Sequence, residues 1–110
     1  MVKIIYDTIS NGKILERALN GDSHAQIVLS YKLYFGLGIE TNKKDSKKFC
    51  LQSCESGNIN ALGFKLFIGW KTEIDLEESL KFFCEYKRNE ENEKNEDYSY
   101  ALNMIGFFFF

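Results

Sequence analysis

YFGLGIETNKKDSKKFC, residues 34–50, is the most informative stretch of this chain. Two glycines one residue apart precede a lysine-rich run, so the stretch could be a phosphate-binding loop or a turn between two helices. A phosphate loop requires G-x-x-x-x-G-K-[ST], or G-x-G-x-x-G after a strand. The stretch has no third glycine, and no strand pattern precedes it. We therefore expect Gly36 and Gly38 to end one helix, Ile39 to plug the turn, and the next helix to begin at Asp45.

Composition sets limits on the class of protein. The 110 residues suit one small domain, and a 45% hydrophobic content can fill its core. The absence of proline favours helices joined by glycine turns. A formal net charge of −2 predicts no nucleic-acid partner. No apolar run reaches about 18 residues, which predicts no membrane insertion.

Cysteine usage and the N-terminal sequence bear on localisation. The three cysteines are an odd count, unlike the dense, even set of a secreted disulfide scaffold. The start, MVKIIYDTIS, lacks the apolar region of a signal peptide, and the chain has no N-x-[ST] sequon. Localisation stays unknown on these grounds, and an intracellular chain with reduced thiols is favoured.

The residues that could carry chemistry are few. Cys50 and Cys54 lie four residues apart, but a zinc site usually needs a second such pair, which is missing. Buried thiols at core positions are the simpler interpretation. His24, the single histidine, is expected to face solvent or cap a helix. The sequence therefore predicts no catalytic residue, no metal site and no cofactor.

An internal repeat of about 33 to 36 residues organises the chain. LNGDSHA (residues 19–25) and ESGNINA (residues 55–61) share their spacing at an offset of 36 residues. Later markers recur at an offset of 33 residues, as in the pair Ser30 and Gly63 and the pair Ser46 and Ser79. The difference predicts that the second unit lost about one turn, from its first helix or from the turn before it. A third, partial copy repeats the spacing of the first helix: Ala101, Ile105, Gly106, Phe109 and Phe110 correspond to Ala25, Leu29, Ser30, Leu33 and Tyr34.

The repeat predicts an all-α fold made of helix–turn–helix units, with no strand. The expected parts are an N-terminal helical cap (1–20), a first repeat (21–56), a second repeat (57–87), a charged insertion (88–97) and a partial third repeat (98–110). The helices of the second repeat are expected near 59–68 and 76–87. The charged insertion has no apolar residue, so a solvated helix extension or a loose loop is expected there.

The markers of the first unit also resemble a known family, the Sel1-like repeat. They are, in chain order, Gly21-Asp22, Ala25-Gln26, Leu29, Tyr34, Gly36-Leu37-Gly38-Ile39, Ser46, Phe49-Cys50, Ser53-Cys54 and Gly57-Asn58. Isoleucine stands where that family usually has valine, and Phe49 stands where it usually has tryptophan. The second unit keeps fewer markers. The resemblance implies a TPR-like α-α superhelix of about two repeats with partial flanking units.

The resemblance also implies a function. Sel1-like proteins assemble complexes, including membrane-associated degradation machinery and signalling pathways, so we expect a non-catalytic scaffold or adaptor. Its protein or peptide ligand would lie in the concave groove lined by the first helices. The candidate partner-binding residues are Tyr31, Lys32, Lys65 and Trp70. Trp70 follows Gly69 in an inter-helix turn, where it could cap the core or serve as an exposed anchor.

Two alternatives stay open at this point. The chain could be a fragment of a larger repeat-containing signalling protein, because GFFFF (residues 106–110) stops inside the third unit. Otherwise this tail could fold onto the array or contact a partner. The second alternative is a cysteine-rich, hydrolase-like branch of the Sel1 family. That branch needs a further cysteine about eight residues after Cys54, where this chain has Leu62.

Overall fold

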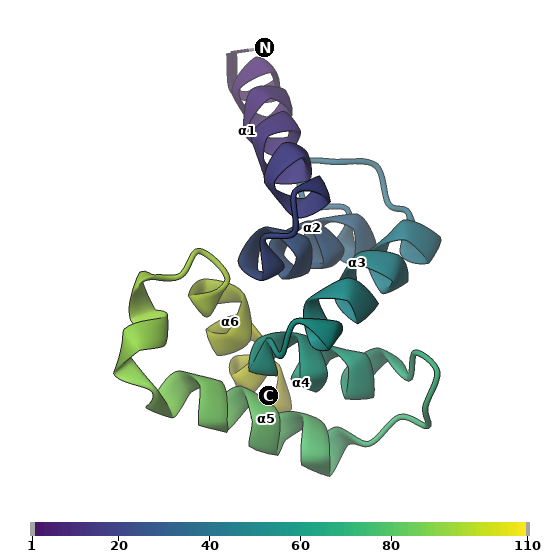
Figure 1. Ribbon diagram of the computed structural model, residues 1–110, viewed down its shortest axis with the longest axis vertical. Helices are drawn as coiled ribbons and strands as arrows, with labels where there is room; N and C mark the ends of the chain where they lie inside the picture. Colours follow the sequence, from purple (N-terminus) through teal and green to yellow (C-terminus); the bar gives the residue numbers. More distant parts are fainter. Residues whose placement is uncertain (1, 110) are drawn as a thin grey trace.

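The computed structural model describes residues 2–109, with side chains from Asn11 onward, and contains no strand in this part of the chain. Six α-helices and one 3-10 helix follow one another (Figure 1). Their bounds are α1 Val2–Leu19, α2 Ser23–Phe35, α3 Lys43–Glu55, α4 Ile59–Ile68, α5 Leu76–Arg88, η1 Glu90–Lys94 and α6 Tyr98–Phe108. The all-α prediction is confirmed, and the predicted helices of the second repeat agree with α4 and α5 to within a residue.

Short polar caps and glycines fix the helix boundaries. The side chain of Asp22 accepts hydrogen bonds from two backbone N–H groups at the start of α2, and Asn58 caps α4 in the same way. Gly36 (φ 71°) and Gly69 (φ 72°) end α2 and α4 in the left-handed conformation, which glycine adopts without strain. The expected start of α3 at Asp45 is wrong by two residues, because Asn42 caps that helix.

Hydrogen bonds repeat between the two units as the sequence offsets predict. Ser46 Oγ donates to the carbonyl of Ser30 over 2.6 Å, and Ser79 Oγ donates to the carbonyl of Gly63 over 2.7 Å. Both pairs are 33 residues apart in the chain. The turns before α2 and α4 are equivalent, whereas α2 has 13 residues and α4 has 10. The lost turn therefore lies in the first helix of the second unit.

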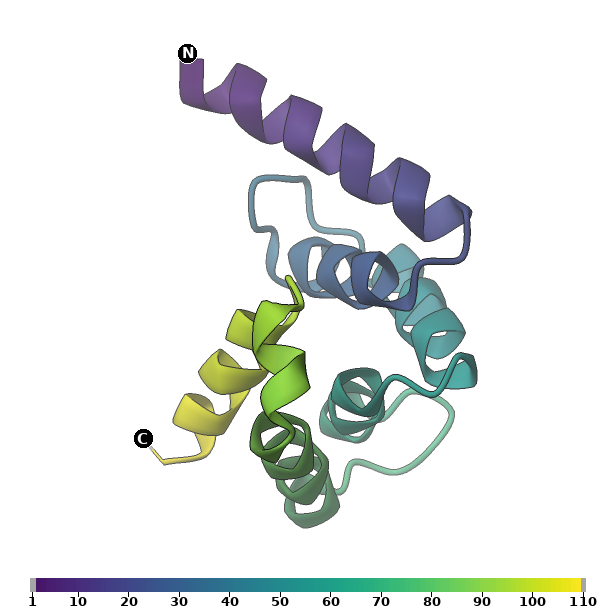
Figure 2. The ribbon, with the colours of Figure 1, turned by 60° about the vertical axis from the view of Figure 1, so that its left-hand side comes forward.

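Adjacent helices pack on one another, and two clusters of buried side chains form the core. The smaller cluster lies between α1, α2 and α3. The larger one contains side chains of α2, α3, α4, α5 and α6. Figure 2 shows these helices arranged around a common centre. At the centre of this cluster the ring of Tyr31 lies 4.2 Å from that of Phe64 and 5.2 Å from that of Tyr100, measured between centroids. Aromatic rings thus fill the inner side of the array.

The charged insertion agrees with the expectation over residues 90–94 and departs from it at Asp97. Residues 90–94 form η1, which is largely exposed, as predicted. Asp97, however, is completely buried. The prediction of a solvated segment is wrong at Asp97, because its carboxylate is held by side chains from three other helices.

The aromatic tail is divided between core and solvent. Phe108 packs partly against the core, with its ring centroid 6.4 Å from that of Phe83. Phe107 and Phe109 are 64% and 72% exposed. The tail therefore folds onto the array at Phe108 and, through an edge contact of 5.4 Å with the ring of Phe67, in part at Phe107, whereas Phe110 lies outside the described residues.

Two helical glycines give a matched test of the packing. A Cβ on Gly63 would lie 2.8 Å from the buried ring of Phe83, whereas a Cβ on Gly106 would meet nothing within 4 Å. We expect Gly63→Ala to lower the free energy of unfolding by about 1–3 kcal/mol through overpacking. Gly106→Ala should raise it by about 0.5–1 kcal/mol, because alanine favours the helix. Urea unfolding of both variants measures the difference, and a stabilising Gly63→Ala would contradict the packing.

Candidate functional site

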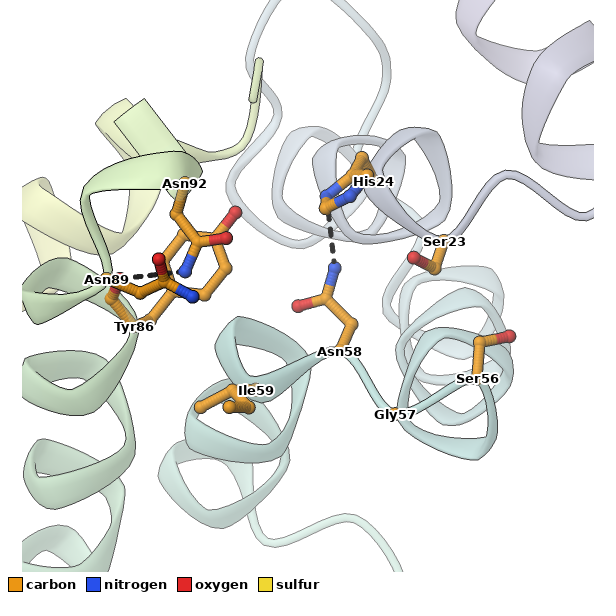
Figure 3. A pocket seen from close by; sticks show the side chains of 9 residues that line it. All are labelled: Ser23, His24, Ser56, Gly57, Asn58, Ile59, Tyr86, Asn89 and Asn92. Carbon is orange, nitrogen blue, oxygen red and sulfur yellow. Dashed lines mark hydrogen bonds between the residues drawn. The ribbon is translucent and has the colours of Figure 1, made fainter. Parts of the chain in front are cut away.

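A polar pocket opens where the start of α2, the α3–α4 turn and the end of α5 meet (Figure 3). Its volume is about 260 Å³. Hydroxyl, amide and imidazole groups make up most of its lining, which consists of Ser23, His24, Ser56, Gly57, Asn58, Ile59, Tyr86, Asn89 and Asn92. Helix caps explain part of this composition, since Asn58 caps α4 and Asn89 caps η1.

The carboxylate of Asp97 organises the site. It accepts hydrogen bonds from Tyr86 Oη (2.7 Å), His24 Nδ1 (3.0 Å) and the side-chain amides of Asn58 and Asn60 (3.3 Å each). Because a carboxylate only accepts, the contact with Asp97 requires a proton on His24 Nδ1; the side-chain amide nitrogen of Asn58 lies 3.4 Å from the same ring nitrogen (Figure 3). We call these five residues the Asp97 hub.

The hub reaches the aromatic core through Tyr31. Asn60 Nδ2 donates to the carbonyl of Asp97 over 2.9 Å, and Asn60 Oδ1 accepts from Tyr31 Oη over 2.6 Å. Burial raises the pKa of Tyr31, and burial together with the bond to Asp97 raises the pKa of Tyr86. Both phenols therefore stay protonated and donate at ordinary pH.

The hub is suited to fixing helices in place. Asp97 stands at the N-cap of α6 but makes no side-chain cap bond there. Its oxygens are bound instead by residues of α2, α5 and the beginning of α4. In the part of the chain that the structure describes, no hydroxyl or thiol is hydrogen-bonded to the His24 ring, so the pair of His24 and Asp97 lacks the nucleophile contact of a triad. The His24 imidazole belongs both to the hub and to the lining of the pocket.

Tyr31, a residue predicted to bind a partner, lies in the core. Its side chain is only 1% exposed and is hydrogen-bonded to Asn60. The expectation that Tyr31 is presented in a groove is wrong, because the first helices pack together and enclose its ring.

The other three predicted partner residues are half-buried. Lys32 Nζ donates to the carbonyl of Leu37, in the turn that ends α2, over 3.4 Å. Trp70 lies in the α4–α5 turn, with the ammonium groups of Lys47 and Lys71 within 5.6 and 5.5 Å of its ring centroid. No side-chain contact among the described residues joins two of the four predicted residues.

Trp70 combines features of both of its expected roles. The ring is half-buried, and its indole nitrogen is buried without a hydrogen-bond acceptor among the described residues. The flanking lysines cover its faces from α3 and from the turn itself. Lys32, Lys65 and Trp70 stay predictions as partner-binding residues.

Cys50 and Cys54 form a pair of unequal thiols on α3, and all three cysteines of the chain are free. Cys50 is completely buried, with its Sγ 3.6 Å from the carbonyl of Ala61. The neighbouring Cys54 thiol, together with burial, raises the pKa of Cys50, whereas the neighbouring Cys50 thiol lowers the pKa of Cys54. The charge of nearby Lys65 lowers the pKa of Cys54 further. No group of three or more metal-ligating side chains occurs from Asn11 to Phe109.

A second cavity, apolar and of about 280 Å³, lies between α1, α2 and α3. Its described lining is Asn11, Gly12, Leu15, Leu29, Leu33, Ile39, Asp45 and Phe49. Asn11 Nδ2 donates to the carbonyl of Gly38 over 2.7 Å, so this side chain ties α1 to the glycine turn. Ile39 was expected to plug this turn, and it packs against the core cluster that lies between α1, α2 and α3.

Replacement of the central carboxylate tests the hub. In Asp97→Asn an amide nitrogen, which cannot accept, replaces one carboxylate oxygen and the negative charge is lost, so buried donors lose their charged acceptor. We expect the free energy of unfolding to fall by about 3 kcal/mol. Glu93→Gln, an exposed change in the same segment, should stay within about 0.5 kcal/mol. Urea unfolding compares the two, and equal effects would show that Asp97 does not hold the helices together.

Alkylation kinetics test the thiol pair. Cys54 should react with iodoacetamide before Cys50 in the folded protein, because it has the lower pKa and the greater exposure. Cys50→Ala removes the neighbouring thiol and should move the pH midpoint of Cys54 alkylation upward, whereas Cys50→Ser keeps a polar group beside Cys54 and should move it less. Mass spectrometry across a pH series gives the midpoints. An unchanged midpoint in Cys50→Ala would show that the Cys50 thiol does not lower the pKa of Cys54.

Comparisons with protein-family models, curated proteins and solved structures found no match to this chain. Among the described residues, no helix is both long and apolar enough to cross a lipid bilayer. The similarity to Sel1-like repeats therefore rests on the sequence markers, and the repeated hydrogen bonds at an offset of 33 residues are compatible with it.

Proposed function

We propose that the chain is a non-catalytic helical-repeat module, of Sel1-like type, that binds another protein or a peptide as a scaffold or adaptor. One surface feature is the main support. Six rings contact one another in series at the C-terminal ends of α2, α4 and α6. This aromatic row consists of Tyr34, Phe35, Phe64, Phe67, Phe107 and Phe108.

The row is continuous and partly open to solvent. Ring centroids lie 6.1 Å apart from Phe35 to Phe64, 6.3 Å from Phe64 to Phe67, and 5.4 Å from Phe67 to Phe107. Phe64 is fully buried, whereas Phe35 and Phe107 are 47% and 64% exposed. The row therefore passes through the core at Phe64 and presents exposed rings on either side of it. Exposed aromatic side chains of this kind are enriched at protein interaction sites.

Lysines accompany the row and suggest the chemistry of the ligand. Lys43 places its ammonium group 5.0 Å from the ring centroid of Tyr34. Lys32 lies one helical turn before Phe35, and Lys65 is two residues before Phe67. A complementary ligand would carry aromatic or aliphatic side chains together with aspartate or glutamate. We infer a segment of a partner protein with this composition.

The Asp97 hub supports this function indirectly. It ties α6 to α2, α4 and α5, the helices that meet beneath the row. Rings fixed on packed helices lose little freedom on binding, so more of the contact energy contributes to affinity. Lys32 and Lys65 would attract the acidic residues of the ligand to a surface that is already formed.

Peptides selected from a random display library against the full chain provide the test. We expect enriched peptides to combine aromatic with acidic residues. The double variant Phe35→Ala, Phe107→Ala should weaken their binding by about tenfold or more, since exposed rings in an interface are frequent hot spots. Fluorescence anisotropy with the labelled peptides measures the dissociation constants.

The matched control is the double variant Leu19→Ala, Ile74→Ala. These side chains are 70% and 62% exposed, comparable to the two phenylalanines, and lie outside the row. Their replacement should change binding by less than about twofold. An equal loss in both double variants would show non-specific apolar adhesion and overturn the proposal, as would an absence of enriched peptides.

A further inference from the structure

Helix α6 repeats the residue pattern of α2. Ala101 corresponds to Ala25 and Gly106 to Ser30, both at the same offset. The two alanines are completely buried. The inward side of α6 therefore packs as that of α2 does, and the positions on its other side can be compared one by one.

In both complete units, a second helix covers the position that Gly106 occupies on α6. The carbonyl of Ser30 on α2 accepts from Ser46 on α3 over 2.6 Å. The carbonyl of Gly63 on α4 accepts from Ser79 on α5 over 2.7 Å. A phenylalanine follows each of these serines after three residues. The two covering helices thus share the pattern S-x-x-F.

On α6, no described residue covers this side. A Cβ at Gly106 would meet nothing within 4 Å, whereas a Cβ at Gly63 would touch the ring of Phe83 on α5. Five positions of α2 are buried: Gln26, Ile27, Ser30, Tyr31 and Leu33. None of their five counterparts on α6 is buried: Leu102, Asn103, Gly106, Phe107 and Phe109. We call these five α6 residues the open face.

We propose that the open face binds an amphipathic α-helix of a partner protein that carries the pattern S-x-x-F. Its serine would donate to the carbonyl of Gly106, and its phenylalanine would lie over Leu102 or Phe109, the exposed apolar side chains on either side. The occupant is defined by the chain itself, because the same helix surface is seen twice with such a helix in place.

No described helix of the chain is available for this role. Helices α3 and α5 are already packed on α2 and α4. In α1, the residue that corresponds to Phe49 by the offset of 36 is Lys13, which is exposed. A lysine there would face the uncharged surface of α6, whose sequence YSYALNMIGFF contains no ionisable acid or base except its two tyrosines. These observations favour a partner protein over a second copy.

A peptide with the sequence of residues 75–89, DLEESLKFFCEYKRN, serves as the probe, labelled with fluorescein and carrying Cys84→Ala. We expect saturable binding to the full chain by fluorescence anisotropy. Gly106→Leu should weaken it by about tenfold, because the side chain keeps the helices apart. Gly106→Ser should stay within about twofold, since serine occupies this position in α2. The peptide variant Ser79→Leu should also bind less tightly.

Each other outcome would overturn the inference. Equal binding to wild type and Gly106→Leu would mean that the peptide displaces the resident α5 or adheres elsewhere. Self-association of the free chain that Gly106→Leu abolishes, measured by sedimentation velocity, would identify a second copy as the occupant. An absence of saturable binding would leave the face without a ligand of this kind. Phe107 belongs to both the aromatic row and the open face, so the single variant Phe35→Ala, compared with the Gly106 variants, distinguishes ligands of the row from ligands of the open face, and the two proposals fail separately.

Discussion

The pairing of one buried carboxylate constrains how this array closes. Asp97 is fully buried, and an unpaired charge at such a place would cost several kcal/mol. Its four side-chain donors come from α2, α5 and the beginning of α4, so a shift of any of these helices would leave part of the charge unsatisfied. The carboxylate thereby turns a row of neighbour-to-neighbour helix contacts into a closed bundle, in which Tyr31 can reach Tyr100 across the inner side.

This closure decides where a ligand can bind. An open groove along the first helices would need free space between α2 and α6, but the rings of Tyr31, Phe64 and Tyr100 occupy the inner side. What stays accessible is the rim at the C-terminal ends of these helices, where Phe35 and Phe107 are exposed. The interaction surface that we propose therefore follows from the same packing that excludes the expected groove.

Signals that act within a few residues of the chain allowed the helices to be predicted. Contacts between residues that are far apart in the chain could not be predicted. Glycines in left-handed turns and polar caps act within a few residues, so the boundaries of α4 and α5 could be predicted closely. The burial of Tyr31 depends on how far the array curves, which no short pattern encodes. Asp97 closes a run of polar residues that is typical of a solvated segment, and its donors lie 11 to 73 residues away in the chain. Asn60, a polar residue two positions after the cap Asn58 in an otherwise apolar helix, was the available hint of a polar core.

The two ends of the described array differ physically. At the α1 end, the guanidinium of Arg17 binds the carboxylates of Asp22 and Glu96, so α1 is held both to the start of α2 and to the segment before α6. At the α6 end, Gly106 presents the small-residue surface that α2 and α4 use for close helix contact, with no described residue against it. Small residues at a helix surface lower the cost of close approach, and the exposed Phe109 beside them adds apolar area to be buried. The small residue at Gly106 and the exposed Phe109 therefore favour the docking of a further helix on α6.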